Sequence, residues 1–172
     1  MRSEHAAGSA TDAVAPTVAV LTISTSAANG AESDESGPTL AECAALAGCK
    51  LVAQEIVSDD QDAIEDWLRN QVKLGVALIF TTGGTGFTPD DVTPEATRAV
   101  IERQAPGIAE AMRAEAQKHT PLGIMSRGVA GIAGRTLIVN FPGRPKAIDE
   151  AFGVVAPILG HAVESLSREH GY

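Results

Sequence analysis

Aromatic residues, cysteines, positive charge and long apolar runs are all scarce in this 172-residue chain. Aromatic side chains make up 3% of the residues, so Ala, Val, Ile and Leu must fill the interior, which favours helices packed closely on a sheet. The two cysteines, Cys43 and Cys49, lie in apolar surroundings without the CxxC spacing of a metal or redox motif. We expect them to be reduced thiols in the core.

Positive charge is outweighed by negative charge, with 13 Lys and Arg against 22 Asp and Glu, a net charge of −9. Without a basic stripe, nucleic acid is not an expected partner. An anionic ligand would have to bind through backbone amides and a few local Arg or Lys residues. No apolar run approaches the roughly 18 residues of a membrane span, so no membrane partner is expected.

The first residues have the composition of a tail rather than of a targeting segment. Residues 1–16 are small, polar and aperiodic, and they lack the apolar stretch of a signal peptide. We therefore expect a cytoplasmic protein with a mobile tail over residues 1–16 and a single domain over 17–168, a size at which one compact core is the default.

The remaining chain alternates between short apolar, β-branched runs and amphipathic segments. The runs predict strands over 17–24, 50–57, 76–82 and 135–141. The amphipathic segments predict helices over 39–48, 58–73, 93–104, 106–119 and 146–169, with Pro157 kinking or breaking the last. This order is typical of a three-layer α/β/α sandwich around a mostly parallel sheet.

The most unusual segment is the glycine-rich loop after the third predicted strand, in FTTGGTGFTPDDVTPEA (80–96). Ligands of open α/β sheets bind at the carboxyl ends of strands, and glycines there let backbone N–H groups approach a phosphate. The loop is neither a Walker A loop nor a dinucleotide fingerprint, because Gly86 is followed by Phe87. A glycine-rich turn required only by tight backbone geometry is the alternative.

Acidic residues follow two strand ends. Asp90 and Asp91 stand between two prolines, just before Thr93 and Pro94, a good N-cap and first helical residue. Asp59 and Asp60 occupy the corresponding place after the second strand. Either pair could simply stabilise a helix N-terminus, but carboxylates beside a phosphate loop favour a bridging Mg²⁺.

Basic residues border the last predicted strand. Ser126-Arg127 precedes it, and Pro142-Gly143-Arg144-Pro145-Lys146 follows it. Arg127 presents a planar fork of donors and Lys146 a mobile charge near a helix start, and both suit phosphate oxygens. Solvated surface cations are the alternative for each residue alone.

Three motifs in the same order and spacing resemble the MogA/MoaB family of molybdenum cofactor biosynthesis: DESGP, TTGGTGFTPDDVTPEAT and SRGVAGIAG.TLIVNFPG.PKA. The resemblance covers about residues 17–166 and is closest to the molybdopterin adenylyltransferases, including gephyrin-like G domains. It implies a three-layer α/β/α fold, a homotrimer or hexamer, and hand-over to a molybdenum-insertion protein. The implied reaction joins molybdopterin to the adenylyl group of Mg-ATP and releases pyrophosphate.

The resemblance also implies roles for individual residues. Asp91 matches the essential aspartate of the family's DxTPEA segment and would hold the Mg²⁺, and Asp59 matches the aspartate of its PDE segment. The nucleotide would lie on the glycine loop, formed by Thr82, Gly83, Gly84, Thr85 and Gly86. The pterin and its phosphate would lie on the remaining motif residues, which are Asp34, Ser36, Gly37, Ser126, Arg127, Pro142, Gly143 and Lys146.

One position departs from the family pattern. The first strand is usually followed by Ser-Asp, whereas this chain has Ser24-Thr25. The leading hypothesis is the adenylyltransferase. The first alternative is a MoaB-type carrier or scaffold that binds molybdopterin without efficient adenylylation, against which the presence of both aspartates argues. The second is the related domain of molybdenum-insertion or competence-damage proteins, which usually occurs within longer chains.

Overall fold

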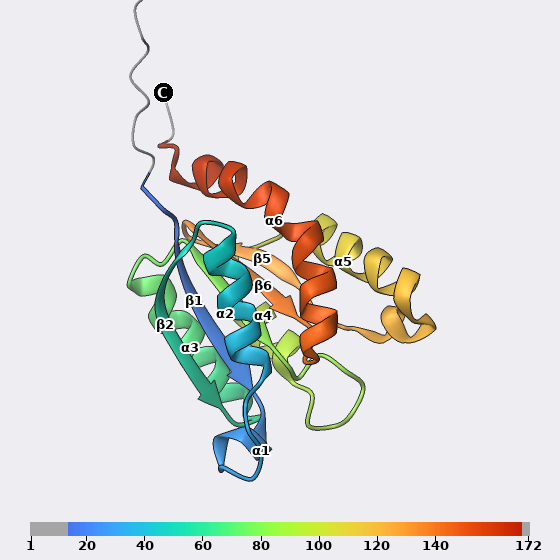
Figure 1. The fold of residues 1–172 in the computed structure, drawn as a ribbon. Coiled ribbons are helices and arrows are strands. Elements are labelled where there is room, and N and C mark those ends of the chain that lie inside the picture. Colours follow the sequence, from blue (N-terminus) through green and yellow to red (C-terminus); the bar gives the residue numbers. More distant parts are fainter. Residues whose placement is uncertain (1–13, 170–172) are drawn as a thin grey trace, which may run out of the picture.

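The computed structural model describes residues 14–169 as helices stacked on both faces of a six-stranded sheet (Figure 1). The strand order is β2-β1-β3-β6-β5-β4. The strands are β1 (Thr17–Ile23), β2 (Lys50–Val57), β3 (Leu78–Thr82), β4 (Arg103–Gln104), β5 (Ala130–Ala133) and β6 (Thr136–Phe141). The first four strands in spatial order are parallel, and β5 runs antiparallel to both β6 and β4.

Helices cover both faces, which confirms the predicted α/β/α layers. They are α1 (Thr25–Ala28), α2 (Ser36–Leu46), α3 (Gln61–Lys73), α4 (Thr93–Val100), α5 (Pro106–His119) and α6 (Pro145–Ser167), with a 3₁₀ turn η1 (Pro121–Met125). Figure 1 shows α2, α5 and α6 in front of the sheet and α3 and α4 behind it. None of the helices in the described range is long and apolar enough to cross a membrane.

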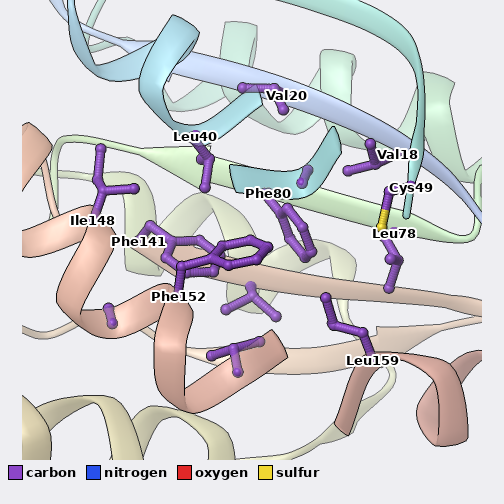
Figure 2. Close-up of a cluster of buried hydrophobic side chains, with 14 of the residues drawn as sticks. Val18, Val20, Leu40, Cys49, Leu78, Phe80, Phe141, Ile148, Phe152 and Leu159 are labelled. Atoms are coloured by element: carbon purple, nitrogen blue, oxygen red, sulfur yellow. The ribbon is translucent and has the colours of Figure 1, made fainter. Parts of the chain in front are cut away.

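Alternating residues of the buried strands feed two separate cores. Val18 and Val20 of β1 pack with α2, α5 and α6, whereas Ala19 and Leu21 pack with α3 and α4. Three of the four phenylalanines, Phe80, Phe141 and Phe152, form the centre of the first core (Figure 2), with ring centroids 5.2–5.8 Å apart. Small aliphatic residues fill the rest, as the shortage of aromatics predicts.

Several predicted boundaries need correction. The predicted helix 93–104 ends at Val100, and Arg103–Gln104 instead form β4 against β5. The strand β5 is not predicted at all. The helix predicted from residue 39 begins one turn earlier at Ser36, and that predicted from residue 58 begins at Gln61. Pro157 lies inside α6, which runs uninterrupted to Ser167 and bends along its length in Figure 1.

Two expectations concern the ends of the chain and its thiols. The expected tail 1–16 falls almost wholly outside the described residues, and Val14–Pro16 have no regular structure. Both cysteines are free, Cys49 buried and Cys43 partly buried.

Candidate functional site

The carboxyl ends of β1, β3 and β6 meet at one edge of the sheet. Thr22 pairs with Thr82, and Thr82 with Phe141, so the three strands stop in register. The loops that follow them are 24–35, 83–92 and 142–144, and β2 adds residues 58–60 beside β1. The topology therefore brings together the loops that the sequence marked as separate motifs.

A pocket of ≈ 340 Å³ lies between these loops. Its walls include Thr82 and Gly83 of the glycine loop, Asp34 and Ser36 before and in α2, and Gly143 after β6. Two of the predicted nucleotide residues and three of the predicted pterin residues thus line the same pocket. The N-termini of α2 and α6 both border it, and neither N-cap side chain accepts a hydrogen bond from its helix. Backbone N–H groups at such ends favour anions.

Asp34 organises the floor of this pocket. Its Oδ2 accepts a hydrogen bond from the Thr22 hydroxyl at 2.8 Å and its Oδ1 one from the Gly37 N–H at 3.0 Å. A β-carbon on Gly37 would collide with the Thr22 hydroxyl and the Asp34 carboxylate, so those side chains would have to shift. The Ser36 hydroxyl donates to the Gly143 carbonyl and thereby links the starts of α2 and α6.

The glycine loop is folded tightly onto its neighbours. Gly83 and Gly84 have positive φ angles of 93° and 67°, which favour glycine. A β-carbon would strike the Ile23 carbonyl at Gly83 and the Thr93 hydroxyl at Gly84. The Thr93 hydroxyl donates to the Gly83 carbonyl at 2.9 Å, so Thr93 fastens the loop instead of capping α4, whose N-cap is Val92. Backbone geometry alone accounts for both glycines.

Asp59 and Asp60 have different surroundings. Asp60 is the N-cap of α3 and accepts a hydrogen bond from the Ala63 N–H at 2.8 Å. Asp59 instead accepts two bonds on Oδ2 from Thr25, from its N–H at 3.0 Å and from its hydroxyl at 2.8 Å. The other oxygen lies toward the glycine loop, since a β-carbon on Gly84 would be 3.4 Å from Asp59 Oδ1. Asp60 therefore caps α3, whereas the bonds of Asp59 run to Thr25, the first residue of α1.

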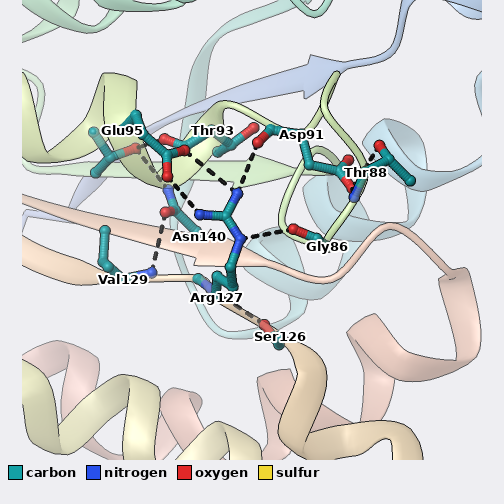
Figure 3. Close-up of polar contacts among 11 residues, drawn as sticks. Gly86, Thr88, Asp91, Thr93, Glu95, Ser126, Arg127, Val129 and Asn140 are labelled. Atoms are coloured by element: carbon teal, nitrogen blue, oxygen red, sulfur yellow. Dashed lines mark hydrogen bonds and ion pairs between the residues drawn. The ribbon is translucent and has the colours of Figure 1, made fainter.

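Asp91 lies beside Gly86, the last residue of the glycine loop (Figure 3). Its Oδ2 accepts hydrogen bonds from the N–H and the hydroxyl of Thr88 at 3.0 and 2.9 Å. A β-carbon on Gly86 would lie 2.7 Å from the same oxygen, so the carboxylate rests against the loop backbone. Asp59 and Asp91 therefore lie beside Gly84 and Gly86, two residues apart in the glycine loop.

Arg127 holds the far side of this segment together. Its Nε donates to the Gly86 carbonyl at 2.7 Å, its Nη2 to the Asp91 carbonyl at 2.7 Å, and its Nη1 to Glu95. The hydrogen bond from Arg127 lowers the pKa of Glu95, and the same bond raises the pKa of Arg127.

The other predicted pterin residues lie apart from the larger pocket. Ser126 and Pro142 line a second, mostly apolar pocket of ≈ 170 Å³ between α5, η1 and α6. Lys146 is exposed in the first turn of α6. Gly37, Arg127 and Lys146 line neither of these two pockets, and neither do Asp59, Asp91 and residues 84–86.

The carboxylates fit a Mg²⁺ ion that would share its ligands with a substrate. No group of three or more His, Cys, Asp or Glu side chains in the described part of the chain could hold a metal. Mg²⁺, however, is usually bound by one or two carboxylates together with substrate phosphates and water. Asp91 uses Oδ2 for its bonds with Thr88, and Asp59 uses Oδ2 for those with Thr25, so each has a second oxygen to offer.

Sequence reasoning missed three residues of this site. Thr25 orients Asp59, Thr93 fastens the glycine loop, and Glu95 pairs with Arg127. Thr25 carried a signal, because it stands where the family pattern has an aspartate. A side chain that bonds a residue 32 positions away, as Glu95 does, leaves no such local trace.

An open α/β sheet with a glycine loop, two helix N-termini and two carboxylates at its carboxyl edge is typical of domains that bind an anionic small molecule. Among known families, the one described as a probable molybdopterin binding domain matches residues 19–161. The chain belongs to this family.

Curated relatives and solved structures agree with this assignment. The molybdopterin adenylyltransferase of Helicobacter pylori (strain J99) is 38% identical over 86% of this chain and 85% of its own length. The molybdenum cofactor synthesis protein cinnamon of Drosophila melanogaster is 42% identical over 89% of this chain, which spans only 26% of that relative. The crystal structure of MoaB from Thermus thermophilus matches with a TM-score of 0.83 and 41% identity, over 88% of this chain and 96% of that one.

Proposed function

We propose that this protein acts in molybdenum cofactor biosynthesis and transfers the adenylyl group of ATP to molybdopterin. A terminal phosphate oxygen of molybdopterin would attack the α-phosphorus of ATP, forming a phosphoanhydride while the bond to the departing pyrophosphate breaks. Relatives named molybdopterin adenylyltransferase, similar over most of their length, support this reaction. The observation that carries the proposal is the placement of two carboxylates against the glycine loop, Asp59 beside Gly84 and Asp91 beside Gly86.

The chain's residues would act mainly by positioning two anions. The glycine loop, Thr82 to Gly86, would bind the nucleotide, and the loops with Asp34, Ser36 and Gly37, with Ser126, and with Pro142, Gly143 and Lys146 would bind the pterin and its phosphate. Helix N-termini and Arg144 supply positive potential to the ≈ 340 Å³ pocket, while Glu32 and Glu35 on its rim favour a bridging cation. Asp91 would hold Mg²⁺, which neutralises charge on the phosphates when bound, and Asp59 would be the second catalytic carboxylate.

The direct test is a transfer assay with molybdopterin, ATP and Mg²⁺, followed by detection of pyrophosphate and adenylylated pterin. Asp91→Asn should lower turnover by about 10²-fold or more, because charge stabilisation dominates such transfers. Pterin binding should persist, since the pterin lies on other loops. Asp90→Asn is the matched control: its side chain is exposed in the same loop and undergoes the same charge change. Turnover of Asp91→Asn equal to wild type would refute the metal assignment.

A second candidate function is binding of molybdopterin without efficient transfer, as a carrier or scaffold. The similarity to a MoaB structure and the replacement of the family aspartate by Thr25 favour it. Tight pterin binding together with no release of pyrophosphate would establish this function in place of the first.

The proposed oligomeric state, location and downstream partner follow from the family. A homotrimer or hexamer, a cytoplasmic location and hand-over of the product to a molybdenum-insertion protein are the family's usual features. Light scattering of the purified protein measures the assembly directly, and a monomer at working concentration would refute it.

A further inference from the structure

Arg127 sits where three segments of the site converge (Figure 3). Its backbone N–H donates to the Thr85 carbonyl at 2.8 Å. Its side chain reaches the Gly86 carbonyl, the Asp91 carbonyl and the Glu95 carboxylate. One residue thus ties the end of the glycine loop and the Asp91 backbone to the first turn of α4.

The guanidinium group is largely committed to these contacts. Nε, Nη1 and Nη2 each donate to an oxygen of this chain, and Nη2 makes a further, longer bond of 3.4 Å to Glu95 Oε2. The Arg127 side chain is 31% exposed, less than that of Glu95 at 40%. A guanidinium held by three groups in a planar fork is suited to fix geometry. It has correspondingly fewer donors for a phosphate.

The segment that Arg127 closes carries the proposed metal ligand. Residues 87–90 between the two bonded carbonyls are exposed. Within this segment, Asp91 Oδ2 is held by Thr88, and its carboxylate rests against Gly86. If the guanidinium were removed, the Gly86 and Asp91 carbonyls would lose their donors, and residues 86–91 would be held only by their own turn and by the bonds of Thr93 to the glycine loop.

We propose that Arg127 and Glu95 are a positioning pair that sets the distance between the glycine loop and Asp91. In this role Arg127 orients other groups and does not bind the substrate phosphate itself, and Glu95 acts only through Arg127. The reaction that depends on this geometry is the adenylyl transfer proposed above, so that part of the inference rests on the proposed function.

The two interpretations of Arg127 predict opposite behaviour for Glu95→Gln. If Arg127 binds the pterin phosphate, loss of the Glu95 charge releases Arg127 toward that ligand, and affinity for molybdopterin stays equal or rises. If the pair positions the loop, Glu95→Gln and Arg127→Met both lower kcat/KM by about tenfold or more, because small displacements at the site are costly. The double variant should be no worse than Arg127→Met, since both changes remove the same interaction.

Hydrogen exchange supplies a readout that does not need turnover. In Glu95→Gln and Arg127→Met, amides of residues 83–91 should exchange about tenfold faster or more, while those of β1 and β3 stay at wild-type rates. Arg127→Lys keeps the charge without the fork and should resemble Arg127→Met. Thermal melting identifies any variant that fails to fold, and Glu95→Gln, which keeps the side chain's shape, remains informative if Arg127→Met does not fold.

A matched control exists on α3. Arg69 donates to the Ala99 carbonyl at 2.8 Å and lies 3.7 Å from Glu65, the same kinds of partner away from the site. Arg69→Met and Glu65→Gln should leave exchange over 83–91 unchanged. Wild-type exchange there in Glu95→Gln, or a kcat/KM loss confined to Arg127→Met, would overturn the positioning pair. A wild-type protein without transfer activity would refute the proposed function and leave the exchange test intact.

Discussion

At the scale of single residues, adjacent aspartates have separable roles. Asp60 caps α3, whereas Asp59 is oriented by Thr25 with one oxygen toward Gly84. Asp60→Ala should reduce the free energy of unfolding by about 1 kcal/mol and leave turnover nearly unchanged. Asp59→Asn should do the reverse, with little change in melting temperature and a large loss of rate. Melting curves and transfer rates of the two variants check this, and equal rates for Asp59→Asn and wild type would refute a catalytic Asp59.

Thr25 offers a second test at the same scale. Its hydroxyl donates to Asp59 Oδ2 and accepts from the Asp59 N–H at 3.0 Å. Thr25→Val removes both bonds without changing the shape of the side chain, so turnover should fall by about tenfold or more as Asp59 loses its orientation. Thr25→Ser restores the hydroxyl and should recover most of the rate. If Thr25→Val and Thr25→Ser have the same kcat, the hydroxyl does not orient a catalytic group.

At the scale of elements, the glycine loop is constrained on both sides. Replacing Gly84 would combine a positive φ with a collision against Thr93, so Gly84→Ala should destabilise the fold by about 1 kcal/mol or more. Gly143→Ala is the control beside the same loop, because its β-carbon would make an ordinary contact 3.5 Å from Gly83. Chemical denaturation of both variants measures the difference. An unaltered unfolding midpoint in Gly84→Ala would show that the loop relaxes.

Strands and helices with a strong local pattern were predictable. The strand Lys50–Val57 and the helix Pro106–His119 match the prediction in full, because period and end signals lie within each segment. The strand β4 could not be predicted, because its two residues form a strand only through their pairing with Gly131 and Ile132. β5 offered a weak signal, the Gly134-Arg135 turn, in a run too rich in small residues to suggest a strand.

The site was predictable in its loops and not in its connections. Asp59, Asp91 and the glycine loop were each marked by their position after a strand. Two aspartates follow β2, and only the contact with Thr25 distinguishes Asp59 from the helix cap Asp60. The partners of Arg127 depend on how α4 packs on the sheet. Such contacts join segments far apart in the chain, so composition and periodicity do not contain them.

At the scale of the whole molecule, the Arg127–Glu95 pair makes stability depend on pH. Arg127 lowers the pKa of Glu95 from 4.5 in the folded state, so the stabilisation is present above about pH 4.5 and is lost as the pH falls through the lower folded value. The free energy of unfolding of wild type should therefore exceed that of Glu95→Gln at neutral pH, and the gap should narrow below 4.5. Urea titrations at several pH values measure it. A gap that is constant with pH would mean that the ion pair does not contribute.

The hairpin of β5 and β6 has a practical consequence for studying this molecule. Its open end carries both Arg127 and Pro142, and its closed end is the Gly134-Arg135 turn, where Gly134 has a φ of 58°. Arg135 is exposed at that opposite end. Burial raises the pKa of the native Cys43 thiol to about 11. A cysteine introduced as Arg135→Cys would therefore react far faster than Cys43 with alkylating dyes at neutral pH. A fluorophore attached at residue 135 would be fixed to the β5–β6 hairpin that leads to Arg127. It would report movement of this hairpin from a position away from the proposed active site.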